Sequence, residues 1–159
     1  MDPIPVVKFD THAQFEAELR ACIARSAHTL QLFDPDYAVY PLGSSEMDAA
    51  LRQFLAGGGR IELAMHRSDT ISLHYPRFLR LLKDFGHRIE CRSTPRTLHM
   101  VTDSFCIGDG VHIVRRYHCD HMRGEACCNS PADCEISLER FGALWVDALP
   151  GLHATTTGL

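Results

Sequence analysis

The sequence predicts an α/β domain built on a mixed, largely parallel sheet with helices on both faces, in the order βαβαβαβββα. In the first half, short apolar runs alternate with segments whose apolar residues recur every three to four positions, as strands alternate with amphipathic helices. The run 60–66 is almost continuously apolar, which is typical of a strand covered on both faces. The stretch 88–116 reads as three strands in quick succession. Strand–helix units in a row imply crossover connections and hence parallel pairing.

The first half is expected to contain three strand–helix units, with strands at 6–9, 29–34 and 60–66. The helices should begin at Asp10 or Thr11, at Ser44 or Ser45, and near Pro76, because these residues cap helices or suit their first turn. Their buried faces are predicted from helical spacing: Phe15, Leu19, Cys22 and Ile23; Met47, Leu51, Phe54 and Leu55; Phe78, Leu81, Leu82 and Phe85.

The second half is expected to close the sheet and end on one helix. Strands are predicted at 88–93, 98–108 and 111–119, the last two joined by a turn at Asp109-Gly110, a strong hairpin signal. The stretch 117–130 is expected to be a loop, and Ser130 should cap the last helix with Pro131 in its first turn. The buried face of that helix is predicted as Ile136, Leu138, Phe141, Leu144, Trp145 and Leu149.

The length and composition suit one globular domain. The chain has 159 residues, of which 45% are hydrophobic and 23% are charged. We expect the domain to span 1–150 and the small, polar segment 151–159 to be a flexible tail. Seven cysteines are an odd number, which favours free thiols over a disulfide framework. We expect Cys22, Cys91 and Cys106 to be small apolar core residues.

Charge and hydropathy narrow the environment of the protein. The start of the chain has no basic and apolar leader, and no run of about 18 apolar residues occurs, so we expect a cytoplasmic protein without membrane insertion. The formal net charge of −4 does not favour broad binding to nucleic acid, because that binding depends on neutralising phosphates.

The order of elements and the ending DCEISLERFGALW resemble one half of the phospholipase D fold. That family carries His-x-Lys-x4-Asp-x6-Gly on a strand and turn before its final helix. Asp103 and Gly110 fit the last two positions, but Arg96 then stands at the histidine position and Leu98 at the lysine position. A second register places His99 at the histidine position, with Val101 for the lysine and Cys106 for the aspartate. Neither register keeps the catalytic pair.

The resemblance therefore implies a degenerate, non-catalytic member of the family. In active members the histidine attacks phosphorus and the lysine stabilises the developing charge, whereas a guanidinium stays protonated and cannot be that nucleophile. We predict a binding or scaffolding module for a phosphate-bearing ligand or a protein partner. The alternatives are a homodimeric phosphodiesterase or nuclease using His99 and Asp103, or a metal-binding or redox-sensing module.

Six residues are candidates for binding an anionic ligand. His66 ends a predicted strand, where open α/β sheets bind ligands, and could share a cleft with Asp34 and His99. Arg96, Arg115 and Arg116 could form hydrogen bonds to a phosphate group if their side chains lie close together. The predicted ligand-binding set is Arg96, His99, Asp103, Arg115, Arg116 and His66. The resemblance also implies a homodimer with the motif strands face to face, which would place Arg96, His99 and Asp103 near the two-fold axis.

Cysteine and histidine gather in the stretch 118–134, here called the Cys/His loop. Its candidate metal ligands are His118, Cys119, His121, Cys127, Cys128 and Cys134. Their spacings fit no common zinc finger, and accidental clustering in a surface loop explains them as well. We therefore predict no cofactor, with zinc at this loop as the alternative.

Overall fold

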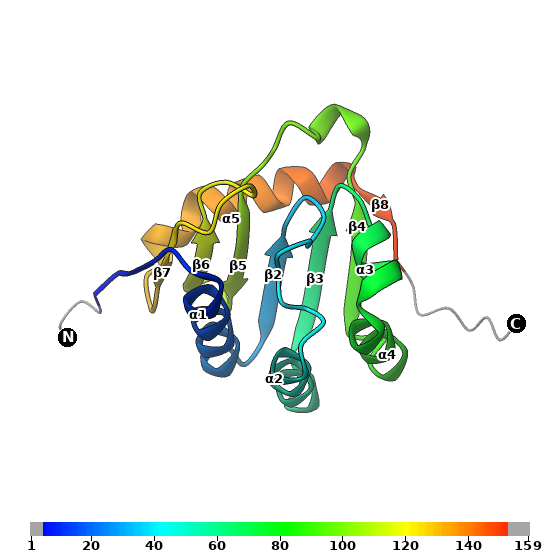
Figure 1. Cartoon of the computed structure of the whole chain (residues 1–159), viewed down its shortest axis with the longest axis horizontal. Coiled ribbons are helices and arrows are strands. Elements are labelled where there is room, and N and C mark those ends of the chain that lie inside the picture. The colour runs from blue at the N-terminus through cyan, green and yellow to red at the C-terminus, as the bar shows by residue number, and fades with distance from the viewer. Residues whose placement is uncertain (1–4, 153–159) are drawn as a thin grey trace, which may run out of the picture.

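The computed structural model describes residues 5–152, and these form one eight-stranded sheet between two helical layers (Figure 1). The strands are β1 (Val7–Phe9), β2 (Thr29–Phe33), β3 (Arg60–Met65), β4 (Ile89–Ser93), β5 (Ser104–Gly108), β6 (His112–Arg116), β7 (Gly124–Cys127) and β8 (Leu149–Pro150). The helices are α1 (His12–Arg25), α2 (Ser45–Ala56), α3 (Asp69–His74), α4 (Pro76–Asp84) and α5 (Pro131–Asp147), with a short 3-10 helix, η1, at Arg96–Leu98. Most of the predicted tail 151–159 lies outside the described residues.

The predicted α/β architecture is confirmed, and the sheet is mixed. Its strand order is β1-β7-β6-β5-β2-β3-β4-β8. Within residues 5–152, β2–β3 and β3–β4 are the parallel pairs, and the other pairs are antiparallel. Parallel pairing is thus less extensive than the strand–helix order predicts. The reason is that β1 does not join β2 but crosses to the far edge, where Val7 pairs with Ala126 of β7.

Two cores lie on opposite faces of the sheet. Helices α1, α2 and α4 pack on one face, and α5 runs across the strands on the other (Figure 1). The predicted stripes of α1 and α2 are buried as expected, and Thr11 and Ser44 cap these helices through their hydroxyl oxygens. The three cysteines predicted as core residues, Cys22, Cys91 and Cys106, are also buried.

The helix predicted near Pro76 begins there as α4, with an additional short helix before it, whereas the strand predicted at 98–108 is shorter than expected. A separate helix, α3, precedes α4, and Tyr75 divides the two. Residues 96–98 form η1 and β5 begins only at Ser104, because the chain first has to cross from β4 over the strand ends to a non-neighbouring strand.

Two further predictions about the last third of the chain need correction. Part of the predicted loop 117–130 is a strand, β7, which is stabilised by pairing with β1 and β6. Ile136 and Leu149 are 70% and 72% exposed, so they do not belong to the buried face of α5. That face follows Cys134, Ser137, Phe141 and Leu144, which recur at helical spacing.

The turn between β5 and β6 forms as predicted, and it joins the hairpin to the start of β2. Asp109 and Gly110 have φ values of 53° and 71°, the left-handed conformation that type I′ hairpin turns need at both positions. The Asp109 carboxylate accepts hydrogen bonds from the backbone N–H groups of Ala27, His28 and Thr29 at 2.8, 2.8 and 3.0 Å. Burial raises the pKa of Asp109, but these three donors outweigh it and hold the pKa below its usual value.

We expect Asp109→Asn to destabilise the domain by about 1 kcal/mol at pH 7, because neutral hydrogen bonds replace charge-assisted ones while asparagine still tolerates positive φ. The stabilising effect of a carboxyl with a depressed pKa is complete above its unfolded-state pKa, about 3.9, and is lost as pH falls through the folded-state pKa. Urea unfolding from pH 7 to pH 2 should therefore show the difference shrinking in acid. Glu139→Ala, on the exposed face of α5, is the control. A pH-independent difference would contradict this role of the Asp109 charge.

Candidate functional site at the strand ends

Three of the six predicted ligand-binding residues, His66, His99 and Arg116, lie close to the point where several strands end. Asp34 follows β2, His66 follows β3 and Thr94 follows β4, while Ser104 begins β5 and Arg116 ends β6. Because β2, β3 and β4 are parallel and β5 is antiparallel to β2, these positions fall on the same side of the sheet, at the ends of its strands. In Figure 1 these strand ends are at the top of the sheet. We call this region the strand-end site.

A buried ion pair between β6 and β2 occupies the centre of this site. Arg116 Nη2 lies 2.6 Å from Asp34 Oδ2, and the two side chains are 0% and 1% exposed. Arg116 also donates to the Ser104 hydroxyl at 3.2 Å and to the carbonyl oxygens of Cys119 and His121 at 3.0 and 3.4 Å. The guanidinium therefore presents no surface to an external ligand, and its charge is neutralised inside the fold.

Backbone donors and aromatic rings complete the surroundings of the pair. The other carboxylate oxygen of Asp34 accepts the N–H groups of Asp36 and Tyr37 at 3.0 and 2.6 Å. The Phe15 ring lies 5.1 Å from the Arg116 guanidinium carbon. Burial, and then the negative charge of Asp34, raise the pKa of Tyr37 well above its usual range. Tyr37 therefore stays a neutral donor, and its hydroxyl donates to the Ala64 carbonyl at 2.9 Å.

His66 is held as a neutral ring on the other side of the site. Its Nε2 lies 2.7 Å from the Val101 carbonyl, which can only accept, so Nε2 carries the proton. Its Nδ1 then accepts from the Thr94 hydroxyl at 2.6 Å. Burial lowers the pKa of His66, although the bond to Val101 opposes this effect. The ring centroid of His99 lies 4.6 Å away, and His99 Nε2 is a buried atom without a hydrogen-bond partner among the described residues.

The remaining predicted residues divide between this edge and other contacts. Arg96 is exposed, and no ion pair or hydrogen bond involves its side chain in the described part of the chain. Asp103 is paired with Arg140 of α5 at 2.8 Å. Arg115 alternates with Arg116 along β6, lies 3.2 Å from Glu125, and donates to the Asp133 carbonyl. The structure thus brings His66, His99 and Arg116 to the site, while Asp103 and Arg115 have partners elsewhere.

The turn at Asp109 identifies a third motif register that the sequence reasoning missed. Asp109 is the acidic residue that stands in the turn between β5 and β6. Counting the motif spacing from it places Thr102 at the histidine position and Ser104 at the lysine position, with Arg116 at the glycine position. The catalytic pair is absent in this register too. The hairpin signal at Asp109-Gly110 could have identified the register from sequence.

The six predicted metal ligands do not converge. Cys127 on β7 and Cys134 on α5 belong to the core on the α5 face of the sheet, and burial raises the pKa of Cys134 to about 11. Within residues 5–152, one group of potential metal ligands does lie close together: His118, Cys119 and Asp120. Their ligand atoms are all within 4.8 Å of one another.

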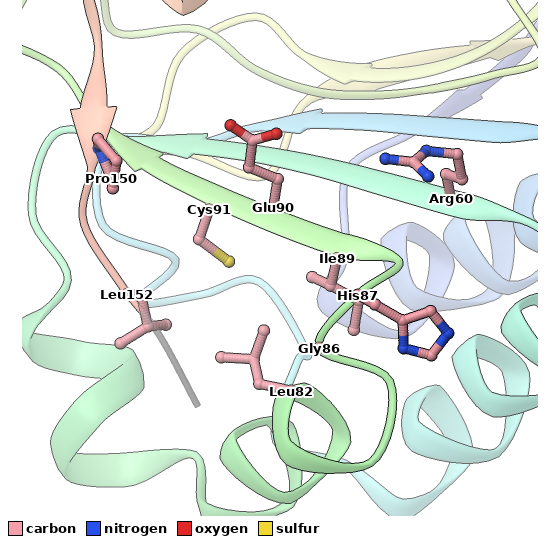
Figure 2. Close-up of a pocket in the computed structure, with 9 residues that line it drawn as sticks. All are labelled: Arg60, Leu82, Gly86, His87, Ile89, Glu90, Cys91, Pro150 and Leu152. Atoms are coloured by element: carbon pink, nitrogen blue, oxygen red, sulfur yellow. The ribbon is translucent and has the colours of Figure 1, made fainter. Parts of the chain in front are cut away.

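A surface hollow lies at the edge of the sheet formed by β4 and β8. It has a volume of about 530 Å³. Its lining residues are Arg60, Leu82, Gly86, His87, Ile89, Glu90, Cys91, Pro150 and Leu152 (Figure 2). None of the six predicted ligand-binding residues lines it. Its cysteine is unsuited to nucleophilic chemistry, because burial raises the pKa of Cys91 to about 12.

Comparison with known protein families accounts for nearly the whole chain. Residues 11–153 match the family described as a domain of unknown function, DUF7931. The chain belongs to the DUF7931 family. A search of curated proteins finds no match. Within residues 5–152, no helix combines the length and apolar character needed to cross a membrane.

Solved structures place the DUF7931 chain in the phospholipase D fold. It superposes on Nuc from Salmonella typhimurium, a phospholipase D family member, with a TM-score of 0.70, 12% identity, and coverage of 94% of this chain and 99% of Nuc. The superposition on NucT from Helicobacter pylori has a TM-score of 0.62 and 7% identity, and it covers 92% of this chain and 99% of NucT. The archaeal chromatin protein TrmBL2, whose structure shows a novel mode of DNA binding, superposes with a TM-score of 0.68 and 10% identity. That superposition covers 93% of this chain and 55% of TrmBL2. At these identities the likeness shows the fold alone, and it confirms the predicted resemblance.

We expect Asp34→Asn to destabilise the domain by about 3–5 kcal/mol, because it leaves the Arg116 charge buried without a counter-ion. Asparagine keeps an oxygen for the N–H groups of Asp36 and Tyr37, so the loss reports mainly on the charge. The double variant Asp34→Asn/Arg116→Met should recover part of it. Urea unfolding of both single variants and the double variant measures the coupling. Strictly additive losses would contradict a coupled pair.

Proposed function

We propose that this domain is a non-catalytic phospholipase D-like module that binds a phosphate-bearing ligand through the segment around η1. The observation that carries the proposal is the composition of the strand-end site. Threonine and serine stand at the motif's histidine and lysine positions when the spacing is counted from Asp109, and a neutralised arginine lies beneath them. The phospholipase D fold of the chain gives these positions their meaning.

The chemistry of these groups argues against phosphodiester cleavage. The family's mechanism needs an imidazole that attacks phosphorus and a cation that stabilises the charge formed in that step. Within the described part of the chain no base hydrogen-bonds to the Thr102 hydroxyl, and the Ser104 hydroxyl accepts from Arg116. Arg116 cannot supply the cation, because its charge is already balanced by Asp34 at 2.6 Å. Binding without turnover is what the remaining groups support.

The binding surface that we propose is formed by Arg96 and His99. Arg96 is exposed and its five N–H donors match a phosphate. His99 lies three residues further along, and its buried Nε2 has no partner in the described structure, so we infer that it donates to an oxyanion once the ring turns toward solvent. His66 holds this segment in place through its bond to the Val101 carbonyl. Its role is therefore to position His99 and not to touch the ligand.

The same segment supports the proposal of a homodimer. It rises beyond the strand ends in Figure 1. Met100 in this segment is 74% exposed, and Tyr117, which directly follows β6, is 49% exposed. A two-fold axis through this region would cover both apolar groups and bring two copies of Arg96 close together. An anion between them would then offset the repulsion between the two cations.

We expect the purified protein to hydrolyse neither bis-p-nitrophenyl phosphate nor single-stranded DNA above background. The physical reason is the absence of a histidine–lysine pair in any register. Release of p-nitrophenol and gel analysis of the DNA provide the measurement, with His99→Ala as the companion variant. Turnover that disappears in His99→Ala would overturn the proposal and establish the homodimeric phosphodiesterase instead.

Phosphate should raise the melting temperature above that in chloride at matched ionic strength, because an anion bound by the folded state alone stabilises it. Arg96→Ala should abolish the difference. Arg77→Ala is the matched control, since this arginine lies on α4 and donates to the Gly43 carbonyl. Light scattering of the same samples at micromolar concentration should report a dimer.

Two results would count against the proposed binding site and assembly. Equal melting temperatures in phosphate and chloride would contradict the proposed anion-binding site. A monomer of 17.8 kDa in both buffers would remove the proposed dimer.

A further inference from the structure

The segment between β6 and β7 carries a cluster of metal-binding side chains that the proposed function does not use. His118, Cys119 and Asp120 follow one another directly and offer three different ligand atoms on one side of the segment. We call residues 117–123 the β6–β7 loop. It is closed at its base, where the Tyr117 N–H donates to the Arg123 carbonyl at 3.0 Å.

The spacing of the three atoms matches the first shell of a small divalent cation. Cys119 Sγ lies 4.0 Å from His118 Nδ1 and 3.8 Å from the nearer Asp120 oxygen. His118 Nδ1 lies 3.6 Å from the other Asp120 oxygen. Bonds of about 2.0–2.3 Å from a tetrahedral zinc to nitrogen, oxygen and sulfur imply ligand–ligand edges of about 3.3–3.8 Å. The three side chains therefore need only small rotations to share one ion.

A second observation points to the same place. His121 lies next in the chain, and its ring centroid is 6.0 Å from that of His118. Its Nδ1 is a buried atom without a hydrogen-bond partner among the described residues. An unpaired buried nitrogen costs free energy, and coordination of an ion would relieve that cost. His121 lies outside the group whose ligand atoms are already within 4.8 Å of one another, so its ring must turn toward His118 to supply the fourth corner of a tetrahedron.

We propose that the β6–β7 loop binds one zinc-like divalent cation through His118, Cys119, Asp120 and His121. The ligand set has one soft thiolate, two imidazoles and one carboxylate, which suits zinc or cobalt(II) better than magnesium or calcium. The site is superficial, because the side chain of Asp120 is 84% exposed. Binding also replaces the hydrogen bond from the Asp120 N–H to His118 Nδ1. Both features predict an ion that exchanges readily with solvent.

The loop is mechanically linked to the strand-end site. Arg116 donates to the carbonyl oxygens of Cys119 and His121, so two of the four proposed ligand residues are anchored on its guanidinium through their backbone. An ion that fixes the loop therefore also fixes the cover of the buried Arg116–Asp34 pair. This coupling does not depend on the phosphate site around Arg96.

The test is a titration of the full chain with cobalt(II), followed by absorption spectroscopy in a reductant that does not bind metal. We expect one equivalent per chain, visible d–d bands of tetrahedral intensity, and a thiolate-to-cobalt charge-transfer band. Cys119→Ser should abolish that band. Cys128→Ser is the matched control, because Cys128 is also partly exposed but lies outside the ligand set.

Affinity and stability provide independent readouts. His118→Ala and His121→Ala should each weaken zinc binding on the order of tenfold or more, since the loss of even an outer-shell partner has an effect of that size. Zinc should raise the melting temperature of the wild-type chain and leave that of Cys119→Ser unchanged. A charge-transfer band that survives Cys119→Ser, or that requires Cys128, would overturn the proposal. Undiminished affinity in His121→Ala would contradict the assignment of His121 as the fourth ligand. Absence of any cobalt–thiolate band would contradict the metal site as a whole.

Discussion

The ion pair between Arg116 and Asp34 is the constraint on which the upper edge of the sheet depends. It joins the ends of two non-neighbouring strands, β6 and β2, through a contact shielded from water. A charge placed in such surroundings must be matched, so the pair determines what can stand around it. Ser104, two carbonyl oxygens of the β6–β7 loop and two backbone N–H groups add further hydrogen bonds to it. The loops above the strand ends are consequently fixed by an interior interaction as well as by their local hydrogen bonds.

The fold by itself does not determine the chemistry of the strand-end site. Open α/β sheets place ligand sites beyond the carboxyl ends of their strands, and this domain keeps that geometry. What differs is that the cation at this edge is turned inward and neutralised, while the groups still open to solvent belong to η1 and the β6–β7 loop. A shared architecture with Nuc and NucT therefore carries no inference about turnover by itself. The side chains at the strand ends carry that inference.

Much of the fold could be read from local patterns, because those patterns report burial. The stripe Phe15, Leu19, Cys22 and Ile23 and the Asp109-Gly110 turn each reflect an interaction within a few residues, and both were predicted correctly. The position of β1 could not be read this way, since its choice between β2 and β7 depends on pairing partners far along the chain. The same holds for the site. His66 and His99 were recognised by residue type, but only the three-dimensional structure shows that Arg116 is buried against Asp34 and that Arg115 pairs with Glu125.

The pairing of β1 with β7 has a consequence for the way in which the domain assembles. The first strand of the sheet hydrogen-bonds to residues 124–126, so it can complete its pairing only after more than a hundred further residues are available. Contacts between such distant segments slow folding, because a long loop must close before they form. The β5–β6 hairpin and the unit from β2 to β4 pair strands that are closer in sequence, so they can form earlier. During synthesis, β1 therefore remains without its sheet partner until β7 emerges, and the edge of β6 that β7 later covers is exposed to other chains in that interval.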